Sequence, residues 1–224
     1  YRIRQPNGTS QFIYTASRLP DGREITAIEE PWARLEALTP SSALGSVLAL
    51  LADTRGAIIG QTYIGKERLS VTAEVPLRDI LVGFADRLKS VTAGYGSFGY
   101  ELIGYRPGEL VRLDILVAGE REPSLAQVVP GDQAYALGRA AVEKLKRLLP
   151  RQLFPVAVQA VVGGRVLARE TIPALQKNVT GYLYGGDRTR KMKLWKKQQR
   201  GKKRLTASGR IEIPPSVFLE MLRG

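Results

Sequence analysis

The sequence has neither cysteine nor histidine among its 224 residues. The first absence excludes disulfides, thiolate metal ligands and thiol nucleophiles, and the second excludes imidazole ligands and general bases within this chain. No phosphate-binding loop of the G-x-x-x-x-G-K-[S/T] type occurs. The most apolar windows, such as residues 43–52, are much shorter than the ~18–20 residues that cross a bilayer, and no signal peptide is recognisable. These absences predict a soluble intracellular protein without the usual catalytic groups.

Positive charge is present mainly in one stretch. Residues 151–210 carry fifteen lysines or arginines against two acids, a local net charge of +13, whereas the rest of the chain has nineteen basic and nineteen acidic residues. The densest part, residues 188–204, has ten cations and no acid. Like charges at this density repel one another in an isolated helix until phosphates neutralise them. The stretch therefore predicts a polyanionic partner and a segment that is mobile without it.

Residues 31–106 predict a βαββαβ unit. Strands are expected at 32–38, 57–64, 68–75 and 95–105, with a hairpin turn at 65–67. The first helix begins near the N-cap candidates Ser41 and Ser42 and ends at Gly56, and the second runs from about Leu77 to Gly94. Its inward stripe comprises Ile80, Leu81, Phe84, Leu88 and Val91. This order is that of a ferredoxin-like antiparallel sheet with both helices on one face.

A second α/β unit is predicted for residues 107–187. Residues 111–117 alternate as a strand, residues 133–149 follow a helical period, and two strands at 154–162 and 165–172 meet at Gly163-Gly164. The fold class is therefore α+β. Residues 1–30, which are polar and turn-rich, are interpreted as the end of a preceding domain and a linker. Residues 188–224 are interpreted as a basic, mobile tail that Asp187 could cap as a helix.

Two short motifs favour structural roles. Residues 94–99 match the dinucleotide pattern G-x-G-x-x-G, but here a helix ends and a strand begins, the reverse of the order that the motif needs. Phe98 and Tyr100 share a strand face, as in RNA-recognition domains, yet core packing is the favoured interpretation.

Glu29 and Glu30 are adjacent acids in a polar segment and are interpreted as solvated, so no catalytic pair is assigned.

The residues also resemble a known family. Glu30-Pro31 and the segment 90–98 are similar to the start and end of the fifth domain of elongation factor G and its relatives. Further segments resemble the carboxyl-terminal half of LepA, also called elongation factor 4, over essentially the whole chain. They are 100–106, 113–117, 150–154, 168–172, Tyr184-Gly185-Gly186-Asp187 and Gly201-Lys202-Lys203-Arg204.

The resemblance implies a ribosome-dependent GTPase that moves tRNAs backward by one codon, supports fidelity under stress or assists ribosome assembly. It implies GTP and Mg²⁺ as cofactors of the parent protein and none for this chain, which lacks the GTPase domain. Because the first residue is Tyr rather than Met, we expect a longer parent chain. Two departures are visible: residues 130–134 read Pro-Gly-Asp-Gln-Ala where the family usually has His-Arg-Asp-Lys-Ala, and Lys196 and Arg200 replace common glutamates.

The predicted site is an RNA-binding surface of fourteen cations and one tryptophan, which could stack on an exposed base. It comprises Arg151, Arg165, Arg169, Lys177, Arg188, Arg190, Lys191, Lys193, Trp195, Lys196, Lys197, Arg200, Lys202, Lys203 and Arg204. The part from Arg151 to Lys177 is expected to present one fixed face, and the part from Arg188 to Arg204 to adapt to its ligand. No catalytic, cofactor or metal residue is assigned.

The expected partners are the ribosome, through ribosomal RNA and A-site tRNA, for a monomer in the cytoplasm. One alternative is a stand-alone RNA-binding module, which would bind generic RNA hairpins equally well. Another is a protein on the cytoplasmic side of the membrane, bound to anionic lipid. The three apolar residues Met192, Leu194 and Trp195 make a poor membrane face, so this alternative is less favoured.

Overall fold

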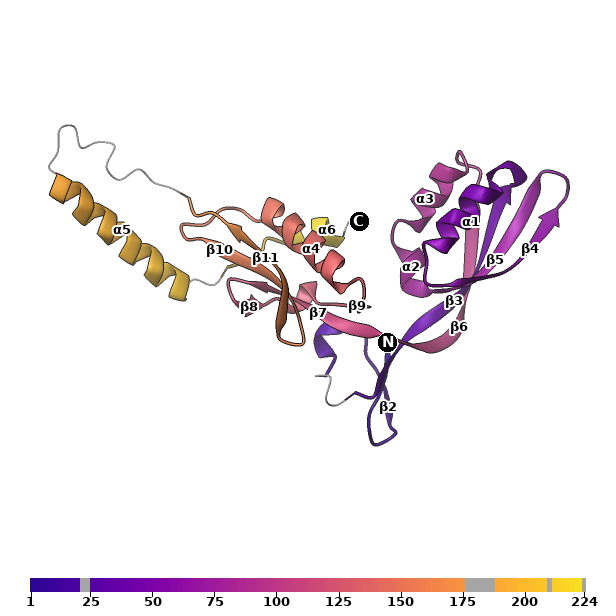
Figure 1. Cartoon of the computed structure of the whole chain (residues 1–224), viewed down its shortest axis with the longest axis horizontal. Coiled ribbons are helices and arrows are strands. Elements are labelled where there is room, and N and C mark those ends of the chain that lie inside the picture. Colours follow the sequence, from indigo (N-terminus) through magenta and orange to yellow (C-terminus); the bar gives the residue numbers. More distant parts are fainter. Residues whose placement is uncertain (21–24, 176–187, 209–210, 223–224) are drawn as a thin grey trace. The chain divides into compact units, whose positions relative to one another are not determined.

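A computed structural model describes residues 1–20, 25–175, 188–208 and 211–222, without the side chains of residues 202–208. The chain divides into two compact units (Figure 1). The first comprises residues 1–14 and 20–109, and the second comprises residues 15–19 and 110–223. Both combine antiparallel sheet with helices, which confirms the predicted α+β class.

The first unit is a six-stranded sheet in which β3 is central. Its elements are β1 (Arg2–Arg4), β2 (Ser10–Phe12), β3 (Ala27–Pro40), the 3₁₀ turn η3 (Ser41–Ala43), α1 (Leu44–Ala52), β4 (Ala57–Ile64), β5 (Arg68–Pro76), α2 (Leu77–Leu81), α3 (Phe84–Val91) and β6 (Ser97–Gly108). Strand β3 pairs with β1 and β5 along one edge and with β6 along the other, and β4 pairs with β5. All neighbours are antiparallel, so the predicted ferredoxin-like βαββαβ order is confirmed.

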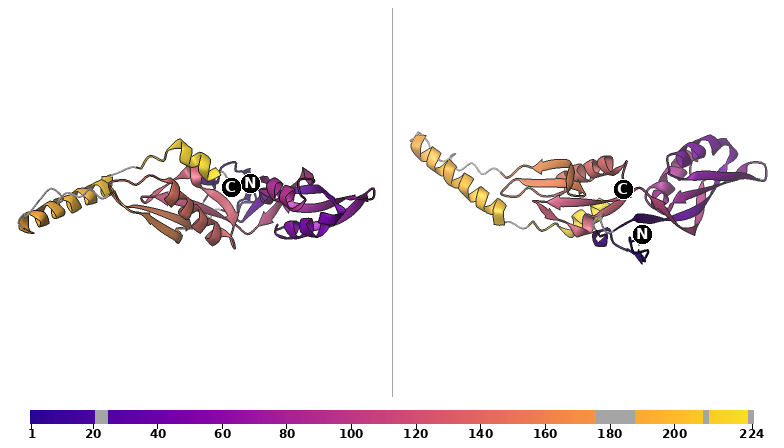
Figure 2. Two further views of the ribbon diagram at one scale, coloured as in Figure 1. Left: turned by 90° about the horizontal axis from the view of Figure 1, so that it is seen from above. Right: turned by 60° about the horizontal axis from the view of Figure 1, so that its bottom comes forward.

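The core of this unit lies between the sheet and its helices, which cover one face of the sheet (Figures 1 and 2). Because side chains alternate along a strand, every second residue of β3 and β5 faces this core. Phe98 meets the ring of Phe84 edge to face at 5.0 Å between centroids, so its predicted packing role is confirmed. The fully buried members include Ala33, Leu35, Ala37, Val47, Leu69, Val71 and Val75.

The helical segments differ from their prediction in three places. The second helix is split into α2 and α3, because Gly83 has φ +72°, a left-handed conformation that breaks the helical hydrogen bonds. Leu81 therefore lies exposed beside the break and does not face the core. Ser41 and Ser42 form the turn η3 and make no capping bond. Helix α1 ends before Gly56, whose role is close approach, since a Cβ there would lie 2.3 Å from the Glu74 carbonyl oxygen.

Glycines shape the turn between α3 and β6. Gly94 has φ +87°, and its amide donates to the Lys89 carbonyl at 2.7 Å, as in helix-closing turns. The Gly96 amide donates to Thr92 Oγ1 at 2.7 Å, and a Cβ at Gly96 would lie 2.6 Å from that oxygen. The G-x-G-x-x-G match is thus a helix-to-strand turn, which confirms the structural interpretation of Gly94.

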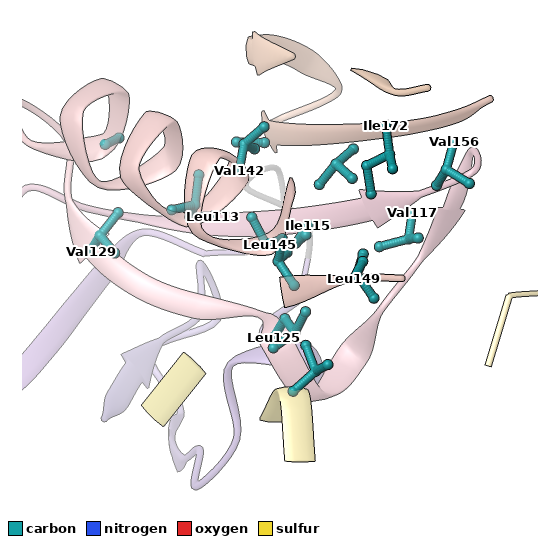
Figure 3. Close-up of a cluster of buried hydrophobic side chains, with 14 of the residues drawn as sticks. Leu113, Ile115, Val117, Leu125, Val129, Val142, Leu145, Leu149, Val156 and Ile172 are labelled. Atoms are coloured by element: carbon teal, nitrogen blue, oxygen red, sulfur yellow. The ribbon is translucent and has the colours of Figure 1, made fainter. Parts of the chain in front are cut away.

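The second unit is a five-stranded sheet in the order β11-β10-β7-β8, with β9 also on β7. Its elements are η1 (Ala16–Arg18), β7 (Leu110–Val117), β8 (Glu120–Arg121), η4 (Pro123–Leu125), β9 (Gln127–Pro130), α4 (Ala134–Leu148), β10 (Val156–Val162), β11 (Arg165–Ile172), α5 (Arg188–Ser208) and α6 (Pro215–Leu222). Figure 3 shows its core, in which Val142 and Leu145 of α4 pack on Leu113 and Ile115 of β7. None of the helices in the described ranges is long and apolar enough to cross a membrane.

The end of the chain belongs to this second core. Val217 of α6 is buried, and Ile211, Ile213, Phe218 and Met221 pack against the same cluster. The prediction of a mobile tail was therefore wrong for residues 211–222. That prediction was based on the charge of the preceding segment and overlooked the short apolar period after Pro214.

The start of the chain is also built into the fold. Strand β1 pairs with β2 and β3, and Ile3 is fully buried. Leu19 is buried in the second unit, and its carbonyl accepts a hydrogen bond from the Arg112 guanidinium. Residues 1–19 thus contribute to both units and are more than the linker that their polar composition indicated.

Candidate nucleic-acid interface

Helix α5 carries most of the predicted site. Its 21 residues include ten lysines or arginines and no acid. Lysine, arginine, glutamine, leucine and methionine are good helix formers, which explains why the segment is helical in spite of its charge. Each described cation of the helix, at positions 188, 190, 191, 193, 196, 197 and 200, is exposed. The helix therefore presents a dense positive surface to solvent.

One face of α5 adds apolar surface to this charge. Arg188, Lys191, Met192 and Trp195 line a shallow hollow, and their spacing of i, i+3, i+4 and i+7 places them along one side of the helix. The Trp195 side chain is 61% exposed and Met192 is 53% exposed. The hollow thus joins an exposed indole and thioether to two cations.

The described cations of the predicted site have no carboxylate partners. Within the described side chains, Arg151, Arg165, Arg169 and the seven cations of α5 form no ion pair. Elsewhere among the described side chains, ion pairs engage cations that include Arg2, Arg4, Arg34, Arg55, Arg87, Arg106, Arg112, Arg121, Arg139 and Lys146. A cation without an internal partner keeps its charge available for a phosphate. Other exposed cations, such as Lys66 and Lys89, also lack a described ion pair, so what distinguishes α5 is the density of its unpaired cations.

The hairpin β10–β11 does not present one basic face. Gly163 and Gly164 have φ +56° and +84°, as predicted for its two-residue turn. Arg165 pairs with Val162, and Arg169 pairs with Gln159. Residues 159 and 162 are three positions apart on β10 and so point to opposite faces, and cross-strand partners share a face.

The prediction of a fixed phosphate-contacting face was therefore wrong for this pair of arginines. The reason is a bulge in β11 opposite Ala160 and Val161, where Leu167 has no partner and the pairing shifts by one residue. Lys177 lies outside the described residues, as do the side chains of Lys202, Lys203 and Arg204.

The acids that were interpreted as solvated are buried. Glu29 is 1% exposed and Glu30 is 2% exposed. Arg2 and Arg4 both pair with the Glu29 carboxylate, Arg4 Nε at 2.6 Å from Oε1. The interpretation as solvated surface was wrong, because β1 pairs with β3 and so places Arg2 and Arg4 beside Glu29. No local sequence signal indicates such a long-range pairing.

Arg55 holds the second of these acids. Its guanidinium donates to Glu30 through Nη1 to Oε1 at 2.6 Å and through Nη2 to Oε2 at 3.0 Å. Nη2 also donates to Asp79 Oδ1 at 2.9 Å. Burial acts to lower the pKa of the Arg55 guanidinium, but hydrogen bonds to Glu30 and Asp79 outweigh it, so the pKa lies above its ordinary value. The cluster is a structural network in which one guanidinium binds both carboxylates.

The sheet face opposite the helices of the first unit carries a hollow of about 730 Å³ that the sequence did not indicate. Its walls include Arg34, Glu36, Leu38 and the strand residues 97–101. Arg34 pairs there with Glu101 at 3.0 Å and with Glu74 at 3.3 Å. These pairs neutralise its charge. In the described part of the chain no three acidic side chains gather as metal ligands would.

Comparison with known proteins gives the class first. Residues 27–116 match the family described as "Elongation factor G C-terminus", and residues 117–223 match the family described as "GTP-binding protein LepA C-terminus". A ferredoxin-like unit followed by this second unit therefore defines the carboxyl-terminal part of a translation factor.

Curated relatives give the family. Proteins named elongation factor 4 from Nitratidesulfovibrio vulgaris, Sulfurimonas denitrificans and Halalkalibacterium halodurans are 47%, 44% and 44% identical over 223 residues, in each case 100% of this chain. The chain belongs to the elongation factor 4, or LepA, family. It spans 37% of the length of these relatives and corresponds to their carboxyl-terminal part. The resemblance found in the sequence is thereby confirmed.

Proposed function

We propose that this chain is the ribosome- and tRNA-binding carboxyl-terminal part of a GTP-hydrolysing translation factor. GTP and Mg²⁺ would bind outside it, and the parent's action would be back-translocation of tRNAs, fidelity under stress or ribosome assembly. The observation that supports RNA binding is the set of exposed cations on α5 that have no carboxylate partner among the described side chains. The family membership supports the ribosome as the source of that RNA.

The charge of α5 sets the expected strength of this interaction. If about 5 of its cations meet phosphates, the affinity falls several-hundred-fold between about 50 and 200 mM salt, which is about 4 kcal/mol. A contact made through hydrogen bonds and apolar surface alone would change little over that range. Salt dependence is therefore the measurable signature of the proposed interface.

Filter binding of the chain to ribosomes across a salt series tests the proposal. A variant with five described cations of α5 replaced by Gln, at positions 191, 193, 196, 197 and 200, is expected to lose most of its affinity and most of its salt dependence. A matched control replaces five other exposed cations without described ion pairs, at positions 18, 66, 68, 89 and 147. Binding indifferent to salt, or an equal loss in both variants, would contradict the proposal.

The choice of ligand separates the alternatives. Equal affinity for ribosomes and for generic RNA hairpins would favour a stand-alone RNA-binding module. Sedimentation with anionic vesicles would favour a membrane-surface protein, for which the apolar side chains of α5 offer little area. Ribosome binding that free tRNA competes away would support contact with the acceptor arm of A-site tRNA.

A further inference from the structure

The sequence has two tryptophans, and their surroundings differ. Trp32 is partly buried, and the Arg106 guanidinium lies 4.4 Å from its ring centroid. Trp195 is 61% exposed, and no described side chain stacks on its ring. An indole is among the largest apolar surfaces a protein can bury, so leaving one in water gives up stabilisation that burial would supply. The exposed indole of Trp195 is thus a candidate contact surface for a ligand.

The neighbours of Trp195 indicate what that partner carries. Met192 extends the apolar surface by one turn, and Arg188 and Lys191 complete the lining of the same hollow. Lys196 and Lys197 follow directly and are exposed. A ligand that covers the indole therefore meets cations within one helical turn, about 5.4 Å along the axis. The surface fits a flat apolar group that is linked on either side to negative charge.

Single-stranded RNA has this chemistry, because each base offers a flat face and is joined to a phosphate on both sides. In a duplex the same faces are stacked inside and cannot reach a side chain. We propose that Trp195 stacks on an unpaired RNA base while the cations around it bind the flanking phosphates, so that α5 prefers single strands to duplexes. This inference rests on the proposed RNA interface and adds a selectivity to it.

Binding of the whole chain to three probes tests the stacking: a single-stranded RNA of about 12 nucleotides, a duplex of the same length and a strand with abasic sites. Trp195→Leu is expected to lower the affinity for the single strand about 5- to 150-fold. It should leave the other two affinities, and the salt dependence of all three, unchanged. Trp195→Phe keeps a ring and should retain most of the affinity. Lys193→Gln, the control, should weaken binding to all three probes alike.

The outcomes separate this inference from the proposed function. Quenching of tryptophan fluorescence by the single strand, lost in Trp195→Leu while Trp32 remains, would support stacking. If Trp195→Leu binds the single strand with wild-type affinity, or if its affinity falls equally for all three probes, the stacking is refuted while RNA binding stands. If the wild-type chain binds none of the probes at low salt, both proposals fail. Circular dichroism checks that the variants keep their helix content.

Discussion

Replacing Arg55 by methionine is expected to destabilise the first unit strongly. The guanidinium makes a two-pronged contact with the Glu30 carboxylate, at 2.6 and 3.0 Å, and a further bond to Asp79 at 2.9 Å. The Glu30 side chain is only 3% exposed. Methionine retains most of the apolar stem but none of the donors. The substitution therefore leaves a buried carboxylate without its cation.

The size of the effect follows from this burial. Removing one partner of a buried ion pair costs about 3–5 kcal/mol, because the remaining charge is neither solvated nor compensated. A domain of ordinary stability has only about 5–15 kcal/mol. With an m value of about 2 kcal/mol/M, the midpoint of urea unfolding should fall by about 2 M.

Trp32 reports this unfolding, since it lies in β3 of the same unit. The measurement is made in a Trp195→Phe background, in which Trp32 is the sole tryptophan. Arg87→Met is the matched control, because the side chains of Arg87 and its partner Asp53 are 55% and 62% exposed and such pairs contribute about 0–1 kcal/mol. The double variant Glu30→Leu with Arg55→Met should recover most of the loss. The reasoning is refuted if Arg55→Met costs no more than Arg87→Met.

Three further outcomes are expected. Gly83→Ala should lower the free energy of unfolding in urea by about 1–2 kcal/mol, because φ is +72° there. No atom lies within 4 Å of the new Cβ, so this cost comes from the backbone conformation alone, whereas Gly45→Ala in α1 should be neutral or stabilising. Val217→Ala should destabilise the second unit by about 2 kcal/mol and expose the chain end to proteolysis; a tail outside the core would tolerate it. Hydrogen bonding to Arg106 lowers the pKa of the Glu74 carboxyl in the folded state, so its contribution to stability is present above the unfolded value, about 4.3, and is lost as pH falls through the folded one. The free energy of unfolding of Glu74→Gln should accordingly change less than that of the wild type between about pH 5 and pH 3, as measured by urea unfolding at each pH.

Periodicity was sufficient to predict the order of strands and helices from β3 to β6 in the first unit, but not the addition of β1 and β2 to its sheet. The strand β5 begins and ends almost where the alternation of apolar residues predicts, because one face of it is buried. The helix α4 follows its 3.6-residue period in the same way. Local patterns of this kind depend only on which side of an element is covered, and sequence alone carries that information.

Features that depend on distant residues or on one backbone angle were missed. The burial of Glu29 depends on Arg2 and Arg4, which a separate strand supplies. The bulge in β11, at Leu167, changes the face of Arg165 relative to Arg169 and has no residue signature of its own. Gly83 could equally have been an interior helix glycine, since a glycine permits a left-handed φ without requiring it. For the candidate interface, sequence predicted where charge is dense and could not predict which cations lack partners.

Residues 15–19 have a consequence for how the molecule is made. They belong to the second unit although the first unit is encoded on both sides of them. Leu19 and its hydrogen-bond donor Arg112 are 93 positions apart, so a nascent chain displays this buried leucine long before its pocket has been synthesised. Closing such a long loop is slow compared with forming helices and hairpins, and the second unit is therefore expected to mature last. A truncated chain that begins at residue 110 would lack residues 15–19, including the buried Leu19, and so would lack part of the second unit. The two units therefore cannot be separated by a single cut of the chain.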